Sequence, residues 1–150
     1  MDDIYEYLKL DHKKVAKLFK LYETSFSEKN KLEIIDMLNK ELTVHALSEE
    51  ETFYKILEQN SKSRKEALHG EEEHQKIKNK LAEITKIQHA NKSLDNKVQE
   101  LKKIVEHHVS EEEGKIFSEA KDILTKEEAY ILKEQMHYLK GKIILKEFPG

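Results

Sequence analysis

The 150-residue sequence has little of what turns, strands and membranes require. It contains no cysteine, one proline and four glycines, whereas 38% of its residues are charged. A chain so poor in turn-forming residues and so rich in helix formers argues against a β architecture. The sequence therefore predicts an all-α fold. Its length and its 37% hydrophobic content suffice for one domain, over residues 1–150, with a real core.

The sequence also lacks the features that several classes of partner require. No apolar run is long enough to cross a bilayer, and the first residues, MDDIYEYLKL, lack the charged-then-apolar layout of a signal peptide. The net charge is −3, and the basic residues are dispersed among acidic ones rather than forming a stripe. We therefore expect a cytoplasmic protein that has neither nucleic acid nor membrane as a partner.

Apolar residues recur every three or four positions in five segments, which is the pattern of amphipathic helices. The predicted helices cover about 3–25, 32–57 and 63–89, then a stretch from about 98, and finally 125–146. Thr125 and Glu128 have the spacing of a capping box at the start of the last helix. Long helices joined by short links pack as antiparallel neighbours, so the first four predict an up-and-down four-helix bundle over about 3–120. The fifth is an additional C-terminal helix.

The sequence repeats itself within the predicted bundle. Residues 45–54, HALSEEETFY, match residues 108–117, HVSEEEGKIF, at a constant offset, and a similar shift aligns Asp-His at 11–12 with Glu-His at 73–74. Each bundle helix then offers one histidine, and the second and fourth add one glutamate each. The six residues are His12, His45, Glu49, His74, His108 and Glu112.

The spacing puts these polar groups on the apolar faces of their helices. Residues four apart project from one side of a helix, so His45 shares a face with Glu49, and His108 with Glu112. A single histidine on such a face is more often a hydrogen-bonded core residue, and a glutamate run is usually solvated. Burying four imidazoles and two carboxylates together is costly unless metal ions satisfy them. We therefore interpret the six residues as a metal site.

The order of these motifs resembles that of the hemerythrin-like HHE cation-binding family, over residues 3–120. The shared pattern has four parts in order. A single histidine (His12) is followed by HxxxEE at 45–50 with an apolar pair at 53–54, then by Glu-His at 73–74, and finally by HxxxEE at 108–113 with an apolar pair at 116–117. The resemblance implies two non-haem iron ions, with His12, His45, His74 and His108 as terminal ligands and Glu49 and Glu112 as bridges. Mixed imidazole and carboxylate donors suit iron, and manganese or zinc is compatible with the same set.

One position departs from the family pattern. Oxygen-carrying hemerythrins have a second histidine one turn after the third-helix ligand, and this sequence has Lys78 there. Glu71 could lean inward as a substitute ligand, and Glu41 could orient the His45 ring, although we prefer to interpret both as solvent-facing carboxylates. Glu71 and His74 also match half of a ferritin-like motif, but ferritin-like sites need that pair twice. The remaining histidines are interpreted as surface imidazoles: His69, His89, His107 and His137.

Three functions fit this pattern. The first is a protein that binds or senses O2, including a reversible O2 carrier, and the second is an enzyme of oxidative defence with peroxide-consuming or oxidase-type activity. The third is an iron-responsive interaction module. We favour a di-iron protein that interacts with O2 or peroxide in oxidative stress, oxygen sensing or iron homeostasis. The sequence does not choose between binding and turnover.

Overall fold

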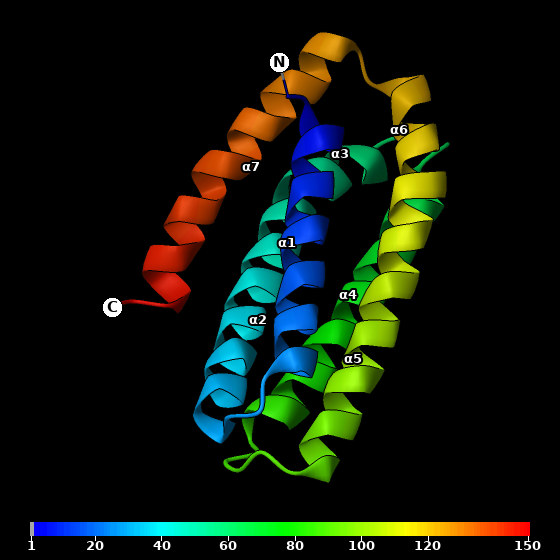
Figure 1. The fold of residues 1–150 in the computed structure, drawn as a ribbon. Coiled ribbons are helices and arrows are strands. Elements are labelled where there is room, and N and C mark those ends of the chain that lie inside the picture. Colours follow the sequence, from blue (N-terminus) through cyan, green and yellow to red (C-terminus); the bar gives the residue numbers. More distant parts are fainter. Residues whose placement is uncertain (1) are drawn as a thin grey trace.

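Four long helices form the body of the molecule. In this computed structural model, which describes residues 2–150, they are α1 (Ile4–Thr24), α2 (Glu28–Glu49), α4 (Arg64–Thr85) and α5 (Lys92–Glu111). Figure 1 shows them running up and down as antiparallel neighbours. The predicted all-α bundle is confirmed.

Both glutamate-bearing helices continue through a π-helical turn. After α2 the chain passes through η1 (Glu50–Tyr54) into the short α3 (Lys55–Glu58), and after α5 it passes through η2 (Glu112–Ile116) into α6 (Phe117–Ile123). The two π turns lie at corresponding places in the repeat, so the repetition extends to the backbone. Such turns are rare, make i to i+5 hydrogen bonds and often occur at functional sites.

Two helices begin earlier than their apolar pattern predicts. α2 begins four residues before position 32, because the Ser27 side chain accepts a hydrogen bond from the Asn30 backbone N–H at 3.3 Å. α5 begins at residue 92, because the Asn91 side chain accepts from the Leu94 N–H at 2.9 Å. Serine and asparagine side chains satisfy the free N–H groups at the start of a helix. The polar residues that the apolar pattern assigned to loops are therefore helix caps.

The C-terminal helix α7 (Lys126–Glu147) folds back along α1 and α2 (Figure 1). Its start is the predicted capping box: Thr125 accepts from the Glu128 N–H at 3.0 Å, and Glu128 accepts from the Thr125 N–H at 2.9 Å. Its contact with the bundle includes the fully buried Met136. The expected additional helix is therefore present.

The apolar core consists of two clusters. One contains Phe19 and Leu38 near the α1–α2 turn, and the other contains Leu8 and Phe53 at the opposite end of the bundle, together with the face of α7. On α1, His12 lies between these clusters in sequence. The polar residues singled out by the repeat therefore form a layer within an otherwise apolar interior.

Across the described residues, 2–150, no helix combines the length and the apolar character needed to span a membrane.

Candidate metal centre

The structure brings all six predicted residues together in the polar layer. None of their side chains is more than 8% exposed, and the carboxylates of Glu49 and Glu112 are fully buried. Glu112 faces two histidines: its Oε1 lies 3.1 Å from His12 Nε2, and its Oε2 lies 3.5 Å from His108 Nε2. These two imidazoles come from α1 and α5.

Glu49 has the equivalent position in the other half of the repeat. Its Oε1 lies 3.4 Å from His45 Nε2 and 3.1 Å from His74 Nε2, which come from α2 and α4. Each glutamate is thus flanked by the histidine of its own helix and by a histidine of another helix. The centre therefore has an approximate twofold arrangement that follows the sequence repeat.

Each of the four imidazoles also contacts a second carboxylate, a different one in each case, through its Nδ1 atom. The Nδ1 contacts are His12 with Glu113 at 2.6 Å, His45 with Asp11 at 2.7 Å, His74 with Glu50 at 2.8 Å and His108 with Glu73 at 2.8 Å. In every case the partner comes from a different helix or π turn. These contacts fix the orientation of each ring and direct its Nε2 toward the two glutamates.

The role of these four carboxylates was not predicted from the sequence, although their positions in the sequence could have indicated it. Each of them is the immediate neighbour of one of the six predicted residues, as Asp11 is of His12 and Glu50 is of Glu49. The alternative suggestion that Glu41 orients His45 is wrong, because Glu41 forms an ion pair with Lys14 at 2.8 Å. The Nδ1 of His45 instead contacts Asp11 of α1.

The donor set fits metal ions. Among the described residues, seven buried atoms of the centre have no hydrogen-bond partner: the Nε2 atoms of His12, His45, His74 and His108, both Oε atoms of Glu49, and Oε1 of Glu112. They approach one another without hydrogen-bond geometry. Leaving so many polar atoms unsatisfied in a core is costly, and a cation between them would satisfy nitrogen and oxygen together.

Electrostatics in the layer show how strongly its groups interact. Burial opposes protonation of His45, but the carboxylates of Glu49 and Asp11 outweigh it and raise the pKa of His45 to about 10. Burial likewise opposes ionisation of Glu112, yet His108 and His12 hold its pKa well below the ordinary range. The carboxylates of the layer therefore attract positive charge, whether protons or metal ions.

Tyr54 belongs to the centre and was not predicted to do so. It is fully buried, its hydroxyl donates a hydrogen bond to Glu112 Oε2, and its ring stacks on His74 with centroids 5.2 Å apart. Burial, reinforced by the Glu112 and Glu49 carboxylates, raises the pKa of Tyr54 well above its usual value. The phenol therefore stays protonated and can donate to Glu112.

The position of Tyr54 depends on the π turn and on a glycine. In an α-helix, five residues advance about 500°, which would carry Tyr54 well away from the face of Glu49, whereas a π turn aligns residues five apart. Gly70 on α4 leaves room for the ring, because a Cβ there would lie 2.7 Å from the Tyr54 hydroxyl oxygen. In the second copy of the repeat, the position equivalent to Tyr54 is occupied by Phe117. This difference between the copies is the sequence feature that could have indicated a special role for the Tyr54 hydroxyl.

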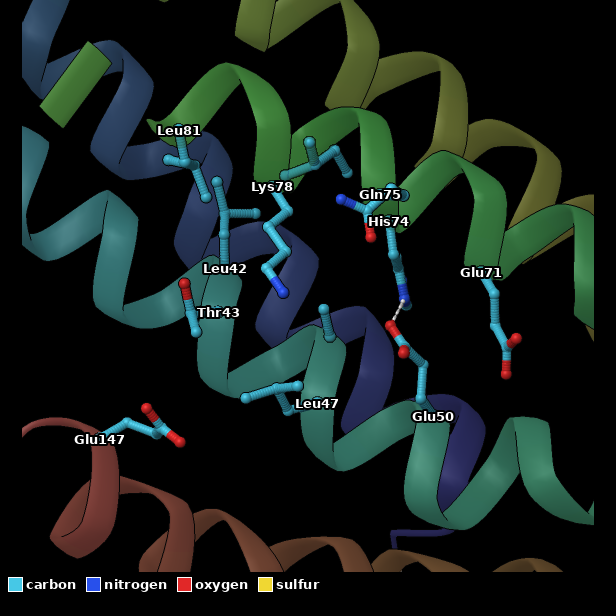
Figure 2. A pocket seen from close by; sticks show the side chains of 12 residues that line it. Leu42, Thr43, Leu47, Glu50, Glu71, His74, Gln75, Lys78, Leu81 and Glu147 are labelled. Atoms are coloured by element: carbon cyan, nitrogen blue, oxygen red, sulfur yellow. Dashed lines mark hydrogen bonds and ion pairs between the residues drawn. The ribbon is translucent and has the colours of Figure 1, made fainter. Parts of the chain in front are cut away.

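Lys78 and Glu71 line a groove between α2 and α4 rather than the buried layer. The groove has a volume of about 270 Å³, and Figure 2 shows Lys78 of α4 beside Leu42 of α2, while Glu50 contacts His74. Burial and the neighbouring Glu58 carboxylate raise the pKa of Glu71 to about 7. Glu71 is not one of the residues whose donor atoms converge in the buried layer.

The other four histidines differ from one another. His89 lies beside Glu28 at 3.2 Å on the surface, and His137 Nδ1 lies 2.9 Å from the Tyr7 hydroxyl. His69 and His107 both contact Glu111, with distances from Nε2 to carboxylate oxygen of 2.9 and 3.1 Å. These two therefore belong to a second cluster of imidazoles and carboxylates.

A four-helix bundle whose core holds facing histidines and glutamates defines a class of metal-binding helical proteins. The family model of the hemerythrin HHE cation binding domain matches residues 3–120, and the chain belongs to this family. Its fold is also that of a solved structure, a hemerythrin HHE cation binding domain-containing protein from Mycobacterium kansasii. The TM-score is 0.81 with 22% identity, and the match covers 100% of this chain and 96% of the other.

One curated relative is a DNA nickase from Nostoc sp. (strain PCC 7120), which is 27% identical over 148 residues. The match covers 94% of this chain but only 40% of the nickase, so the chain spans about two-fifths of that relative. The expectation that nucleic acid is not a partner stays a prediction.

Proposed function

We propose that this protein binds two iron ions at the six-residue centre and reacts there with O2 or hydrogen peroxide. The observation that carries the proposal is the set of seven buried nitrogen and oxygen atoms that face one another without hydrogen-bond partners. Membership of a cation-binding family supports metal as the occupant. Such chemistry would serve oxidative-stress response, oxygen sensing or iron homeostasis in the cytoplasm.

The donor atoms form two groups that share Glu112. One group is His12, His45 and Glu112, the other is Glu49, His74, His108 and Glu112, and within each group the donor atoms lie within 4.8 Å of one another. Glu49 also approaches His45 of the first group. Each group would therefore hold one ion, and the two glutamates would be ligands shared between the two ions. Two carboxylates bridging two divalent ions would neutralise half of their charge.

The carboxylates around the layer prepare the imidazoles for this role. Each one accepts the Nδ1–H of a histidine, which selects the tautomer whose Nε2 lone pair points toward the centre. Iron bound there would supply electrons for reducing O2 or peroxide and Lewis acidity for the charge that develops on oxygen. Tyr54 orients Glu112 and keeps a proton at its hydroxyl against that carboxylate.

A small cavity beside the imidazoles supports a very small molecule as the reactant. Its volume is about 20 Å³, enough for a molecule about the size of water, and all four histidines of the layer line it. The other walls are mostly aliphatic: Val15, Leu42, Ala46, Ile77, Val105 and Val109. The groove between α2 and α4 shares Leu42, Ala46, His74 and Ile77 with this cavity, and we propose this groove as the approach from solvent.

Position 78 favours turnover over reversible carriage. The family resemblance implies a further imidazole there in O2 carriers, and the exposed ammonium of Lys78 cannot replace it. One coordination position would then be open to water or reactant. We expect the reduced, iron-loaded protein to consume O2 irreversibly and its oxidised form to consume peroxide by disproportionation, in which one peroxide is reduced to water while another is oxidised to O2.

Anaerobic iron loading followed by stopped-flow mixing with O2 tests this proposal. We expect two iron ions per chain by elemental analysis, and oxidation that removal of the gas does not reverse. The matched control is the Glu49→Ala/Glu112→Ala variant, which should bind less iron and lack the reaction. One iron or none per chain would refute the di-iron assignment, whereas O2 uptake that reverses fully on degassing would establish carriage.

A further inference from the structure

A second cluster of metal-ligating side chains lies at the surface between α4 and α5. His69 Nε2 is 2.9 Å from Glu111 Oε2 and 3.5 Å from Glu73 Oε2, and His107 Nε2 is 3.1 Å from Glu111 Oε1 and 3.5 Å from Glu73 Oε2. Donor atoms of His69, Glu73 and Glu111 lie within 4.8 Å of one another. Two imidazoles and two carboxylates therefore converge on one place outside the buried layer.

The local sequence explains this convergence. His69 is four residues before Glu73 on α4, and His107 is four residues before Glu111 on α5, so each pair projects from one side of its helix. The two helices are antiparallel neighbours, and their two pairs meet at this point. The spacing is the same His-x-x-x-Glu that builds the buried centre, shifted by one residue on α5.

In residues 2–150, no lysine or arginine forms an ion pair with the two carboxylates of the cluster, although Lys115, which pairs with Glu66 at 3.0 Å, lies near Glu111. Within the described part of the chain, every ion-pair partner of Glu73 and of Glu111 is a histidine. Glu73 is only 4% exposed, so its carboxylate is largely withdrawn from water, where an unbalanced negative charge is unfavourable. A divalent cation would neutralise both carboxylates, and the imidazoles would bind it through nitrogen lone pairs.

We propose that His69, His107, Glu73 and Glu111 bind one divalent transition-metal ion, of the class of Zn²⁺. Two imidazole nitrogens with carboxylate oxygens are ligands that zinc accepts. The side chains of His69 and His107 are 44% and 68% exposed, so an ion there is reachable from solvent and can keep a bound water. The site lies outside the six-residue centre and shares none of that centre's six ligands.

Glu73 connects the two places. Its Oε1 accepts the hydrogen bond of His108 Nδ1 at 2.8 Å, while its Oε2 faces His69 and His107. An ion in the outer site would therefore hold the carboxylate that orients one imidazole of the buried centre. The corresponding carboxylate in the other half of the repeat, Asp11, is held instead by Lys140 of α7.

The test is titration of the iron-loaded full chain with Zn²⁺ by calorimetry, with zinc and iron counted in the same samples. We expect one zinc ion per chain with no loss of iron. The His69→Ala/His107→Ala variant removes two of four ligands, so its zinc affinity should fall by more than the roughly 10- to 100-fold typical of losing an outer-shell partner. His89→Ala, at an exposed histidine beside Glu28, is the matched control and should leave zinc binding unchanged.

If zinc enters the buried centre instead, it displaces iron, and the metal count then shows a loss of iron. The proposal is overturned if the parent protein takes up no zinc beyond that displacement, or if the double variant binds zinc as tightly as the parent. Glu111→Gln keeps the size of the side chain and serves as a second probe should the double variant not fold. It should weaken zinc binding at least about 10-fold, and an unchanged affinity would equally refute the site.

Discussion

At the scale of single residues, the centre depends on side chains that differ between the two halves of the repeat. Tyr54 reaches Glu112, whereas its counterpart Phe117 has no hydroxyl to offer Glu49. Gly70 makes the difference sterically possible, because a Cβ at that position would lie within 2.8 Å of the phenol ring. The approximate twofold symmetry of the six residues is therefore broken by the Tyr54 side chain, for which Gly70 leaves space.

This contact predicts opposite effects for alanine at two helical glycines. Gly70→Ala should lower the free energy of unfolding by about 1–3 kcal/mol, because the new methyl group collides with the buried, stacked Tyr54 ring. Gly141→Ala on α7, where nothing lies within 4 Å of the added Cβ, should raise it by up to about 1 kcal/mol through helix propensity. Urea denaturation of both variants measures the difference, and equal stabilisation by both would show that Tyr54 is not held against α4.

At the scale of elements, polar contacts outside the polar layer also stabilise the packing of the helices. The Tyr22 hydroxyl of α1 donates to Asp95 of α5 at 2.6 Å, and Lys31 of α2 approaches the same carboxylate at 3.2 Å. The hydrogen bond from Tyr22 lowers the pKa of Asp95, burial opposes this, and Lys31 lowers it further. Three bundle helices therefore meet at one ionised carboxylate.

Tyr22→Phe should remove a pH-dependent part of this stability. Because the pKa of Asp95 is lower when folded than when unfolded, its contribution is complete above the unfolded value of about 3.9 and is lost as pH falls through the folded value. At pH 7 we expect the variant to be less stable by about 1 kcal/mol, a modest figure because Asp95 is partly exposed.

Urea denaturation at pH 7 and at pH 3 measures the change, and the gap between parent and variant should narrow at the lower pH. Tyr138→Phe, at a tyrosine that is 69% exposed, is the control and should give no gap at either pH. A gap for Tyr22→Phe that is the same at both pH values would assign its effect to packing alone.

At the scale of the whole molecule, the polar layer lies between two apolar clusters and draws on every long helix. α7 joins it from outside the bundle, because Lys140 contacts Asp11, which in turn accepts from His45. Burial opposes ionisation of Asp11, but His45 and Lys140 lower its pKa to about 2. The additional helix therefore stabilises the orientation of one imidazole of the centre.

Removal of metal should consequently lower the stability of the entire bundle. A ligand present at 100 times its dissociation constant stabilises the folded state by about 2.7 kcal/mol, and in a chain of this size each kcal/mol changes Tm by about 2–4 °C. We expect a chelator that strips the iron to lower Tm by at least about 5 °C in a thermal melt. The Glu49→Ala/Glu112→Ala variant should be indifferent to the chelator, and an unchanged Tm in iron-free parent protein would contradict the prediction.

The fold and the six central residues were readable from the sequence, because both depend on periodicity within single helices. A residue three or four positions from an apolar neighbour shares its face whatever packs opposite, so the spacing of His45 and Glu49 and its repetition at His108 and Glu112 already indicated an inward pair. The capping box at Thr125 is equally local.

Tertiary structure alone decided which side chains meet across helices. The pairing of His45 with Asp11, the reach of Tyr54 to Glu112, and the meeting of His69 with His107 and Glu111 depend on the register and rotation of packed helices. Periodicity within one helix does not contain that information. The π turn at Tyr54 changes the angular step itself, so no count of residues along a regular α-helix predicts where its hydroxyl lies.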